Sequence, residues 1–246
     1  MSQKFVVITF PRTGSELLIQ ALQRHSQVKV MSEILNPMRY ASWRDDLCRI
    51  NKIPELKFTV EVDLNEPKSF MMFEQNENLA KFVKCALAHV DGFKITSDQI
   101  NLNSPVLEAL KAHHGLRIVF LTRQYWHSAI SYWFAIKSQI WQRSTGQVIS
   151  DQPSVVDEKF VERFCSSAAR SMSFYKDYFC GHESISLNYD LMIENWDLSM
   201  AALQSFLNLT AEKLPKVFEK RIEKPLRSMV KNYNSLRDKF SSLGAP

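Results

Sequence analysis

The stretch Phe5-Val-Val-Ile-Thr-Phe-Pro-Arg-Thr-Gly-Ser-Glu-Leu-Leu18 reads as a strand, a tight turn and the start of a helix. The run of strand-forming residues from Phe5 to Phe10 is typical of a buried strand, which Pro11 ends. Apolar residues then recur at helical spacing, which predicts a helix from Ser15 to about Arg24. The first N–H groups of a helix have no internal partner, and the helix dipole attracts negative charge. Turn residues 12–15 are therefore predicted to bind a phosphate-like anion.

The same turn lacks the motif of a metal-bound triphosphate site. A nucleoside-triphosphate P-loop reads G-x-x-x-x-G-K-[ST], in which Lys binds the outer phosphates and the hydroxyl binds Mg²⁺. Here Thr9 or Phe10 stands where the first glycine would be, and Glu16 follows Gly14 and Ser15. The turn suits a phosphate-like group without a metal. The alternative is an ordinary turn between a strand and a helix.

Strands and helices alternate along the rest of the chain. Further strands are expected at 28–30, 93–95, 117–122 and 184–189, and helices at 79–90, 105–115, 129–140, 157–179, 196–207 and 214–223. We expect Gly92 to stop the first of these helices. The alternation predicts an α/β fold, a parallel sheet of four to five strands flanked by helices on both faces, in one domain of residues 1–246. Residues 38–75 show no clear periodicity, and we expect them to form a variable cap over the site.

Composition narrows the classes of ligand. The net charge of +5 suits an anionic ligand, but no Lys/Arg-rich run or basic stripe is present, so nucleic acid is not expected. The four cysteines form no C-x-x-C pair and no histidine lies at ligand spacing, so we expect no metal site and reduced thiols in a cytoplasmic setting. No apolar run approaches about 18 residues, so no transmembrane segment and no secretion signal are expected.

A second anion site is predicted after the strand at 117–122. Arg123 ends that strand, and Ser131 lies eight residues further on, inside the next helix. An Arg fork can grip a phosphate at two points, and a hydroxyl can donate a third hydrogen bond. Because the carboxyl ends of parallel strands share one rim of a sheet, both anion sites are expected there. The ligand would then carry two separated phosphate-like groups.

At these positions the chain resembles the sulfotransferases that use 3′-phosphoadenosine 5′-phosphosulfate (PAPS). Pro11-Arg-Thr-Gly-Ser15 is similar to their 5′-phosphosulfate loop, and Arg123 with Ser131 is similar to their 3′-phosphate-binding pair. Ile185-Ser-Leu-Asn-Tyr-Asp-Leu191 is similar to their strand that carries Tyr-Glu-Asp-Leu. Gly92-Phe-Lys94 and Ser32-Glu33 resemble bacterial carbohydrate sulfotransferases of the trehalose and Nod-factor kind.

The resemblance implies a P-loop-like fold, PAPS as donor and no metal. By matching positions, the donor-binding residues would be Arg12, Thr13, Gly14, Ser15, Glu16, Leu17, Arg123, Ser131 and Tyr189, the last near the adenine. Glu16 departs from the Thr that is common in eukaryotic loops. The catalytic His of cytosolic eukaryotic members has no clear counterpart after Lys94. Related carbohydrate sulfotransferases often dimerise, so a homodimer is consistent with the resemblance.

Sulfuryl transfer needs a base for the acceptor hydroxyl and cations near the leaving phosphate oxygen. Glu33 is the first candidate base, and Asp98, at the end of another strand, is the second. Arg12 is the candidate cation at the leaving group. Lys94 could face the same oxygen, or it could face solvent at a sheet edge.

The acceptor would be a small molecule or glycan with a free hydroxyl, most simply a carbohydrate or glycolipid. Residues 38–75 and 142–157 would choose it, with Trp133, Trp141 and the Arg39–Arg44 segment as candidate contacts. Two other functions stay open. A divergent P-loop kinase would turn over ATP with Mg²⁺, and a non-catalytic nucleotide-binding protein would bind the donor without turnover.

Overall fold

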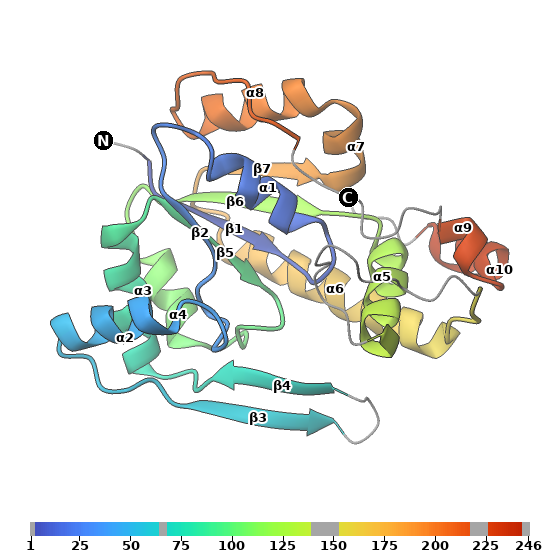
Figure 1. The fold of residues 1–246 in the computed structure, drawn as a ribbon, viewed down its shortest axis with the longest axis horizontal. Helices are drawn as coiled ribbons and strands as arrows, with labels where there is room; N and C mark the ends of the chain where they lie inside the picture. The colour runs from blue at the N-terminus through green and yellow to red at the C-terminus, as the bar shows by residue number, and fades with distance from the viewer. Residues whose placement is uncertain (1–2, 64–67, 139–152, 217–225, 243–246) are drawn as a thin grey trace.

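A parallel sheet of five strands forms the centre of the fold in a computed structural model, which describes residues 3–63, 68–138, 153–216 and 226–242 (Figure 1). Its strands are β1 (Phe5–Thr9), β2 (Val30–Glu33), β5 (Gly92–Thr96), β6 (Arg117–Thr122) and β7 (Ser184–Asn188). Their spatial order is β2-β5-β1-β6-β7. The first strand of the chain is therefore the middle strand of the sheet. This confirms the predicted α/β fold with a parallel sheet.

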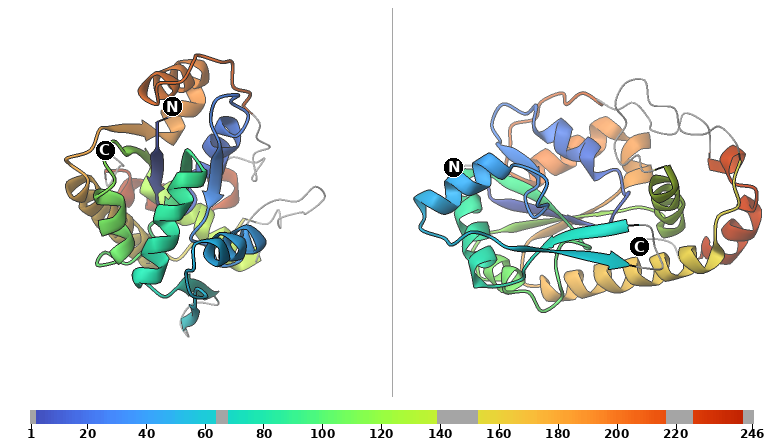
Figure 2. Two further views of the ribbon diagram at one scale, coloured as in Figure 1. Left: turned by 90° about the vertical axis from the view of Figure 1, so that its left-hand side faces the viewer. Right: turned by 60° about the horizontal axis from the view of Figure 1, so that its bottom comes forward.

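Helices cover both faces of the sheet (Figures 1 and 2). Their bounds are α1 (Ser15–Leu22), α2 (Ala41–Ile50), α3 (Glu77–His89), α4 (Pro105–Lys111), α5 (Tyr125–Ser138), α6 (Glu158–Tyr178), α7 (Tyr189–Glu194), α8 (Trp196–Phe206), α9 (Leu226–Met229) and α10 (Tyr233–Phe240). Helices α1 and α8 pack on one face, and α3, α4 and α6 pack on the other. None of the described helices is long and apolar enough to cross a membrane.

The alternation of side chains along β1 divides the core in two. Val6 and Ile8 point toward the α3–α6 face, whereas Phe5 and Val7 point toward α1 and α8. All four are buried, as period-two alternation in a sheet covered on both faces requires. The strand begins in the core and ends at the rim, so the turn after Thr9 is held at the carboxyl edge of the sheet.

Gly92 has a different role from the one that the sequence pattern predicted. Gly92 does not stop the preceding helix, which ends at His89, but begins β5. A Cβ atom there would lie 2.3 Å from the Phe5 ring, so Gly92 is required by close packing between neighbouring strands. The prediction for Gly92 as a helix stop is therefore wrong, while the strand that follows it is confirmed.

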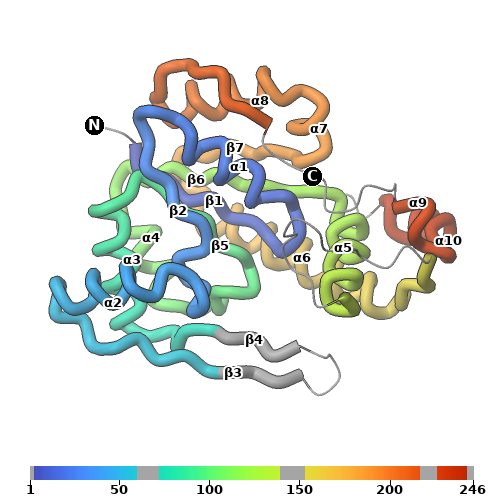
Figure 3. The backbone as a smooth tube through the Cα atoms, in the orientation of Figure 1, coloured from blue at the N-terminus to red at the C-terminus, as the bar shows by residue number. Residues whose placement is uncertain are grey.

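Several elements were missed or misplaced by the sequence patterns. Residues 38–75 contain α2 and the antiparallel hairpin of β3 (Phe58–Asp63) and β4 (Lys68–Phe73), which lies apart from the main sheet (Figure 3). Short helix α7 was not predicted, and neither were α9 and α10, of which α10 packs against α5 and α9 against α10. The helix predicted at 214–223 does not begin by Lys216, and its remainder lies outside the described residues.

Candidate active site

The turn after β1 has an unusual backbone conformation that shapes an anion site. Arg12 and Gly14 have positive φ angles of 68° and 81°. The Thr13 side chain is fully buried and its hydroxyl donates to the Phe10 carbonyl at 3.2 Å, which anchors the turn from below. Helix α1 begins directly after Gly14 without a side-chain cap. The start of α1 therefore lies open at the rim of the sheet.

Backbone N–H groups of this turn are available to an anion. Within the described part of the chain, none of the N–H groups of Thr13, Gly14, Ser15 and Glu16 donates a hydrogen bond. Unsatisfied donors at a helix start, together with the helix dipole, form a ready anion site. The structure places Leu17 elsewhere: its N–H group bonds to the Gly14 carbonyl, and its side chain is buried in the core. The Leu17 N–H group is therefore not among the open donors of the turn, and the role of Leu17 in ligand binding stays a prediction.

The two predicted anion sites meet at the Arg12 backbone. The Arg12 carbonyl accepts hydrogen bonds from Arg123 Nη1 and from Ser128 Oγ, both at 3.3 Å, and Arg12 Nε donates to Ser131 Oγ at 3.3 Å. Residues 119 positions apart in sequence thus lie in contact. Ser128, one turn before Ser131 on α5, was not foreseen, because its role depends on where the Arg12 carbonyl points.

Tyr189 closes the other side of the turn. Its ring lies so near Gly14 that a Cβ atom on residue 14 would be 2.1 Å from Tyr189 Cε2. The Arg123 guanidinium lies over the same ring, 4.7 Å from its centroid. Tyr189 is the first residue of α7, whose N-cap Asn188 accepts hydrogen bonds from the Asp190 and Leu191 N–H groups. Strand β7 and the start of α7 therefore position Tyr189 against the turn.

Two titratable residues beside Arg123 were not predicted as its partners. Asp190 Oδ1 lies 3.7 Å from Arg123 Nε and balances part of its charge. His127 lies half-buried on α5, where burial and the Arg123 charge lower its pKa to about 4 despite the opposing effect of Asp190. At neutral pH His127 is therefore an uncharged imidazole, and Arg123 remains the cation of this part of the site.

A network of four charged side chains lies on the α1 side of the turn. Lys94 Nζ contacts Glu33 Oε1 at 2.9 Å and Glu16 Oε2 at 3.1 Å. Arg39 lies 3.7 Å from Glu16 and 3.8 Å from Glu33. Ser32 Oγ donates to Glu16 at 2.8 Å, and Asn36 Nδ2 donates to Glu33 at 3.0 Å. Two carboxylates and two cations balance each other in this partly buried cluster.

Strand pairing explains why these residues meet. Glu33 and Lys94 are register partners on the neighbouring strands β2 and β5, and Glu16 lies in the first turn of α1 above them. Lys94 is only 2% exposed on an inner strand, so the alternative of a solvent-facing lysine at a sheet edge is wrong. A lysine this deeply buried requires opposite charge, which the two carboxylates supply.

The network keeps both carboxyl groups ionised. Burial alone would raise the pKa of Glu33, but the Lys94 charge, its hydrogen bond and that of Asn36 outweigh this effect, so the pKa lies below 4.5. For Glu16, burial is likewise outweighed by Lys94, the Ser32 hydrogen bond and Arg39, and its pKa is also lowered. Glu33 is therefore a carboxylate at neutral pH and able to accept a proton.

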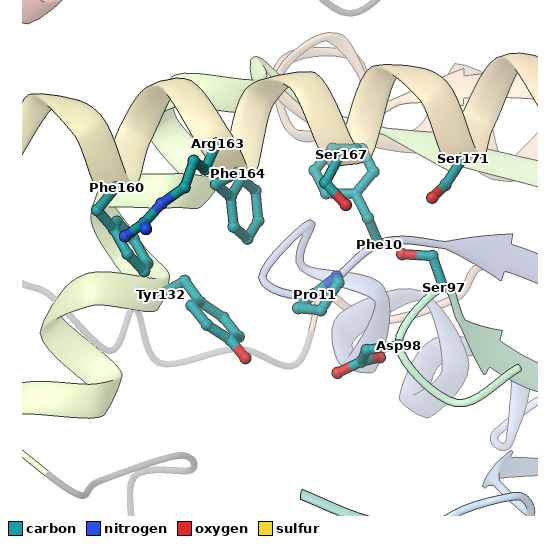
Figure 4. A pocket seen from close by; sticks show the side chains of 11 residues that line it. Phe10, Pro11, Ser97, Asp98, Tyr132, Phe160, Arg163, Phe164, Ser167 and Ser171 are labelled. Carbon is teal, nitrogen blue, oxygen red and sulfur yellow. The ribbon is translucent and has the colours of Figure 1, made fainter. Parts of the chain in front are cut away.

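A pocket of about 320 Å³ opens on the opposite, α6 side of the turn (Figure 4). It is lined by Phe10 and Pro11 of the turn, Ser97 and Asp98 after β5, Tyr132 of α5, and Phe160, Arg163, Phe164, Ser167, Ala168 and Ser171 of α6. Asp98, the second candidate base, therefore borders this pocket. The α6 side chains in this lining were not predicted. The periodicity of a helix shows which of its faces is apolar, but not which loop that face packs against.

The candidates within 38–75 have mainly structural contacts. The Tyr40 hydroxyl accepts a hydrogen bond from the Ser32 N–H group at 3.1 Å, and the Trp43 ring packs edge-on against Phe82. Arg44 is 9% exposed and lies over the Phe73 ring. Only Arg39 of this group joins the charged network. Trp133 packs against the core, and Trp141 lies outside the described residues.

Comparison with known proteins identifies the family. A sequence model described as "Sulfotransferase family" matches residues 4–213, which is most of the chain. The chain belongs to the sulfotransferase family. A search of curated proteins found no match.

Solved structures agree with this family's fold. A sulfotransferase from Alicyclobacillus acidocaldarius superposes with a TM-score of 0.53 at 16% identity, covering 98% of this chain and 92% of that one. A sulfotransferase domain from the curacin biosynthetic pathway gives a TM-score of 0.51 at 15% identity, covering 100% and 93%. At such low identity these likenesses concern the fold alone, which is the P-loop-like α/β fold of sulfotransferases.

Proposed function

We propose that this sulfotransferase-family protein transfers a sulfuryl group from PAPS to a hydroxyl of a small-molecule acceptor, a carbohydrate or a glycolipid. One observation carries the proposal beyond the family assignment. The open anion turn and the cation Arg123 are joined through a hydrogen bond of 3.3 Å to the Arg12 carbonyl. Two anion sites built as one unit suit a donor that carries two separate phosphate-like groups.

The residues present fit such a donor. The unpaired N–H groups of residues 13–16 would hold the 5′-phosphosulfate, in a turn whose shape depends on the Tyr189 ring packing directly against Gly14. Arg123 and Ser131 would hold the 3′-phosphate, and Tyr189 would lie near the adenine. When bound, the donor supplies the sulfuryl group, whose S–O bond to the phosphate breaks as the acceptor oxygen bonds to sulfur.

The chain's own residues would manage charge and proton during transfer. Arg12 of the turn and Lys94 of the neighbouring strand β5 would stabilise negative charge on the departing phosphate oxygen. Glu33 would take the acceptor's hydroxyl proton, because the network orients it and keeps it ionised. Asp98 borders the neighbouring pocket and is the second candidate for this role.

Residues 1–246 would form a single domain. Segments at the rim of the sheet would determine which acceptor it binds. Helix α2 and the β3–β4 hairpin make up most of residues 38–75 and would contribute to this choice. All four cysteines are free thiols, which suits a reducing, cytoplasmic setting.

Calorimetry with 3′-phosphoadenosine 5′-phosphate tests the donor site directly. We expect Arg12→Ala and Arg123→Ala each to weaken binding about 10- to 100-fold, because each removes charge-assisted hydrogen bonds. Arg49→Ala is the matched control, since Arg49 lies exposed on α2 with Asp46 as its partner. Wild-type affinity in both site variants would refute the donor assignment, and Mg²⁺-dependent ATP turnover would favour the kinase alternative.

A further inference from the structure

The pocket on the α6 side of the turn has two chemically different ends. Figure 4 shows Arg163 beside Phe160 at one end, and Asp98 and Ser97 at the other. Pro11 of the donor turn lies between them. A ligand in this pocket therefore meets a cation at one end and a carboxylate, next to the proposed donor site, at the other.

Aromatic rings form the walls between these ends. Tyr132 stacks on Phe160 with centroids 6.1 Å apart and an interplanar angle of 16°, and Phe164 lies 5.4 Å from Tyr132 and 6.2 Å from Phe10. Flat ring faces favour contact with another ring, either aromatic or the CH face of a sugar. A volume of about 320 Å³ is at the lower end for ligand pockets, which suits one ring rather than a chain of several.

Arg163 supplies a charge that the described protein does not balance. Among the described residues Arg163 has no ion pair, and its acidic neighbours on α6, Glu158 and Glu162, instead contact Lys239 at 3.7 and 3.9 Å. A planar guanidinium matches the paired oxygens of a carboxylate, sulfate or phosphate. The Arg163 end of the pocket is thus suited to an anionic group.

The opposite charges fix the direction in which such a ligand would lie. An anionic group placed next to Asp98 would be repelled, whereas at Arg163 it would be attracted. A neutral hydroxyl, by contrast, can donate to a carboxylate such as Asp98. The hydroxyl end of the ligand would therefore point toward Pro11 and the donor turn.

We propose that this pocket is the acceptor subsite and that it selects ring-shaped acceptors with an anionic group, held by Arg163, at the end remote from the reacting hydroxyl. The proposal rests on the proposed sulfotransferase function, whose acceptor class it names. Recognition of the acceptor body here is independent of which carboxylate, Glu33 or Asp98, takes the proton.

Ligand binding measured by NMR titration tests this subsite without requiring turnover. The probes are two matched pairs: methyl glucuronide with methyl glucoside, and 4-hydroxyphenylacetate with 4-ethylphenol. The wild type should bind the anionic member of at least one pair about fivefold more tightly, the upper range for a partly exposed ion pair. Arg163→Gln should remove this preference, and Arg163→Glu should reverse it.

Arg170→Gln is the matched control, because Arg170 is exposed on the same helix but does not line the pocket. It should keep the wild-type preference. The subsite is refuted if the wild type binds no probe, shows no preference for the anionic members, or loses the preference equally in the Arg170 variant.

Failure of the subsite and failure of the proposed function give different results. Arg163-dependent binding of anionic probes in a protein that neither binds 3′-phosphoadenosine 5′-phosphate nor transfers sulfuryl groups would leave the subsite standing and refute the function. If the protein transfers sulfuryl groups at a rate that depends neither on Arg163 nor on the charge of the acceptor, the proposed function stands and the subsite is refuted.

Discussion

Gly14 is the residue on which the geometry of the proposed donor site depends most. It combines a φ of 81° with a Tyr189 ring that leaves no room for a Cβ atom. Arg12, two residues earlier, has a φ of 68°, a conformation that costs a non-glycine residue about 1–2 kcal/mol. A strained residue held beside a glycine of this kind is common where a backbone must face a ligand.

Gly14→Ala should therefore lower the free energy of unfolding by about 2 kcal/mol and abolish tight binding of 3′-phosphoadenosine 5′-phosphate. Denaturant unfolding and calorimetry would measure the two effects. Gly181→Ala is the control, because a Cβ atom there meets nothing within 4 Å. If the two alanine variants behave alike, the Tyr189 contact does not shape the turn.

Single residues also show where sequence patterns stop being informative. The turn residues 12–15, Arg123 and Ser131 could be singled out from residue type and spacing, because they adjoin recognisable strands. The burial of Leu17 and the partners of Lys94 could not, because these depend on which helix covers the strand and on the register of β2 against β5. The alternation of side chains along a strand predicts which face of the sheet a residue lies on, but not which residue on the next strand it contacts.

At the scale of elements, the start of α7 joins the β7 edge of the sheet to the donor turn. Asn188 caps α7 by accepting two N–H groups, and Asn76 caps α3 in the same way, far from the turn. Each side chain should contribute about 1 kcal/mol to the free energy of unfolding. The two caps differ in one respect: the helix that Asn188 caps positions Tyr189 against the donor turn, whereas the helix that Asn76 caps does not reach that turn.

Asn188→Ala and Asn76→Ala should therefore destabilise the protein to a similar extent, as measured by denaturant unfolding. Only Asn188→Ala should also weaken binding of 3′-phosphoadenosine 5′-phosphate, because it loosens Tyr189 against Gly14. Equal affinity in both variants would mean that α7 does not position the donor site.

The charged network joins three other elements, β2, β5 and α1. Lys94→Met would leave the two partly buried carboxylates of Glu16 and Glu33 without their shared cation, and should cost about 3 kcal/mol at neutral pH. In the wild type the pKa values of both carboxyls lie below 4.5, so their stabilising contribution is present above pH 4.5 and is lost as the pH falls through the lowered values.

The stability difference between wild type and Lys94→Met should therefore shrink as the pH falls below 4.5. Denaturant unfolding across pH 3 to 7 would measure it, with Lys84→Met on the exposed face of α3 as the control. A difference that is constant with pH would assign the loss to packing rather than to the ion pairs.

At the scale of the whole molecule, the donor turn lies between two different environments. The charged network occupies the α1 face of the sheet, and the aromatic pocket occupies the α6 face. Strand alternation at β1 and β5 creates this division, since Lys94 points to one face while Phe10 points to the other. One turn at the rim thus lies between the charged network and the aromatic pocket that we propose as the acceptor subsite.

The fold was largely predictable because strands 117–122 and 184–188 and the long helices carry strong periodicity. The hairpin β3–β4, α2 and the C-terminal helices were not, since their short segments are stabilised by contacts with distant parts of the chain. The pocket was missed for the same reason: Arg163 and Phe164 on α6 meet Phe10 and Asp98 only after the sheet is assembled.

Transfer of radiolabelled sulfuryl groups from PAPS to a panel of sugars, glycolipids and phenols tests the central claim most directly. The wild type should form labelled product at a rate that a metal chelator does not change. Glu33→Gln should lower kcat about 10²- to 10⁴-fold while binding of 3′-phosphoadenosine 5′-phosphate persists. Donor binding without any labelled product would contradict the claim and identify a non-catalytic nucleotide-binding protein.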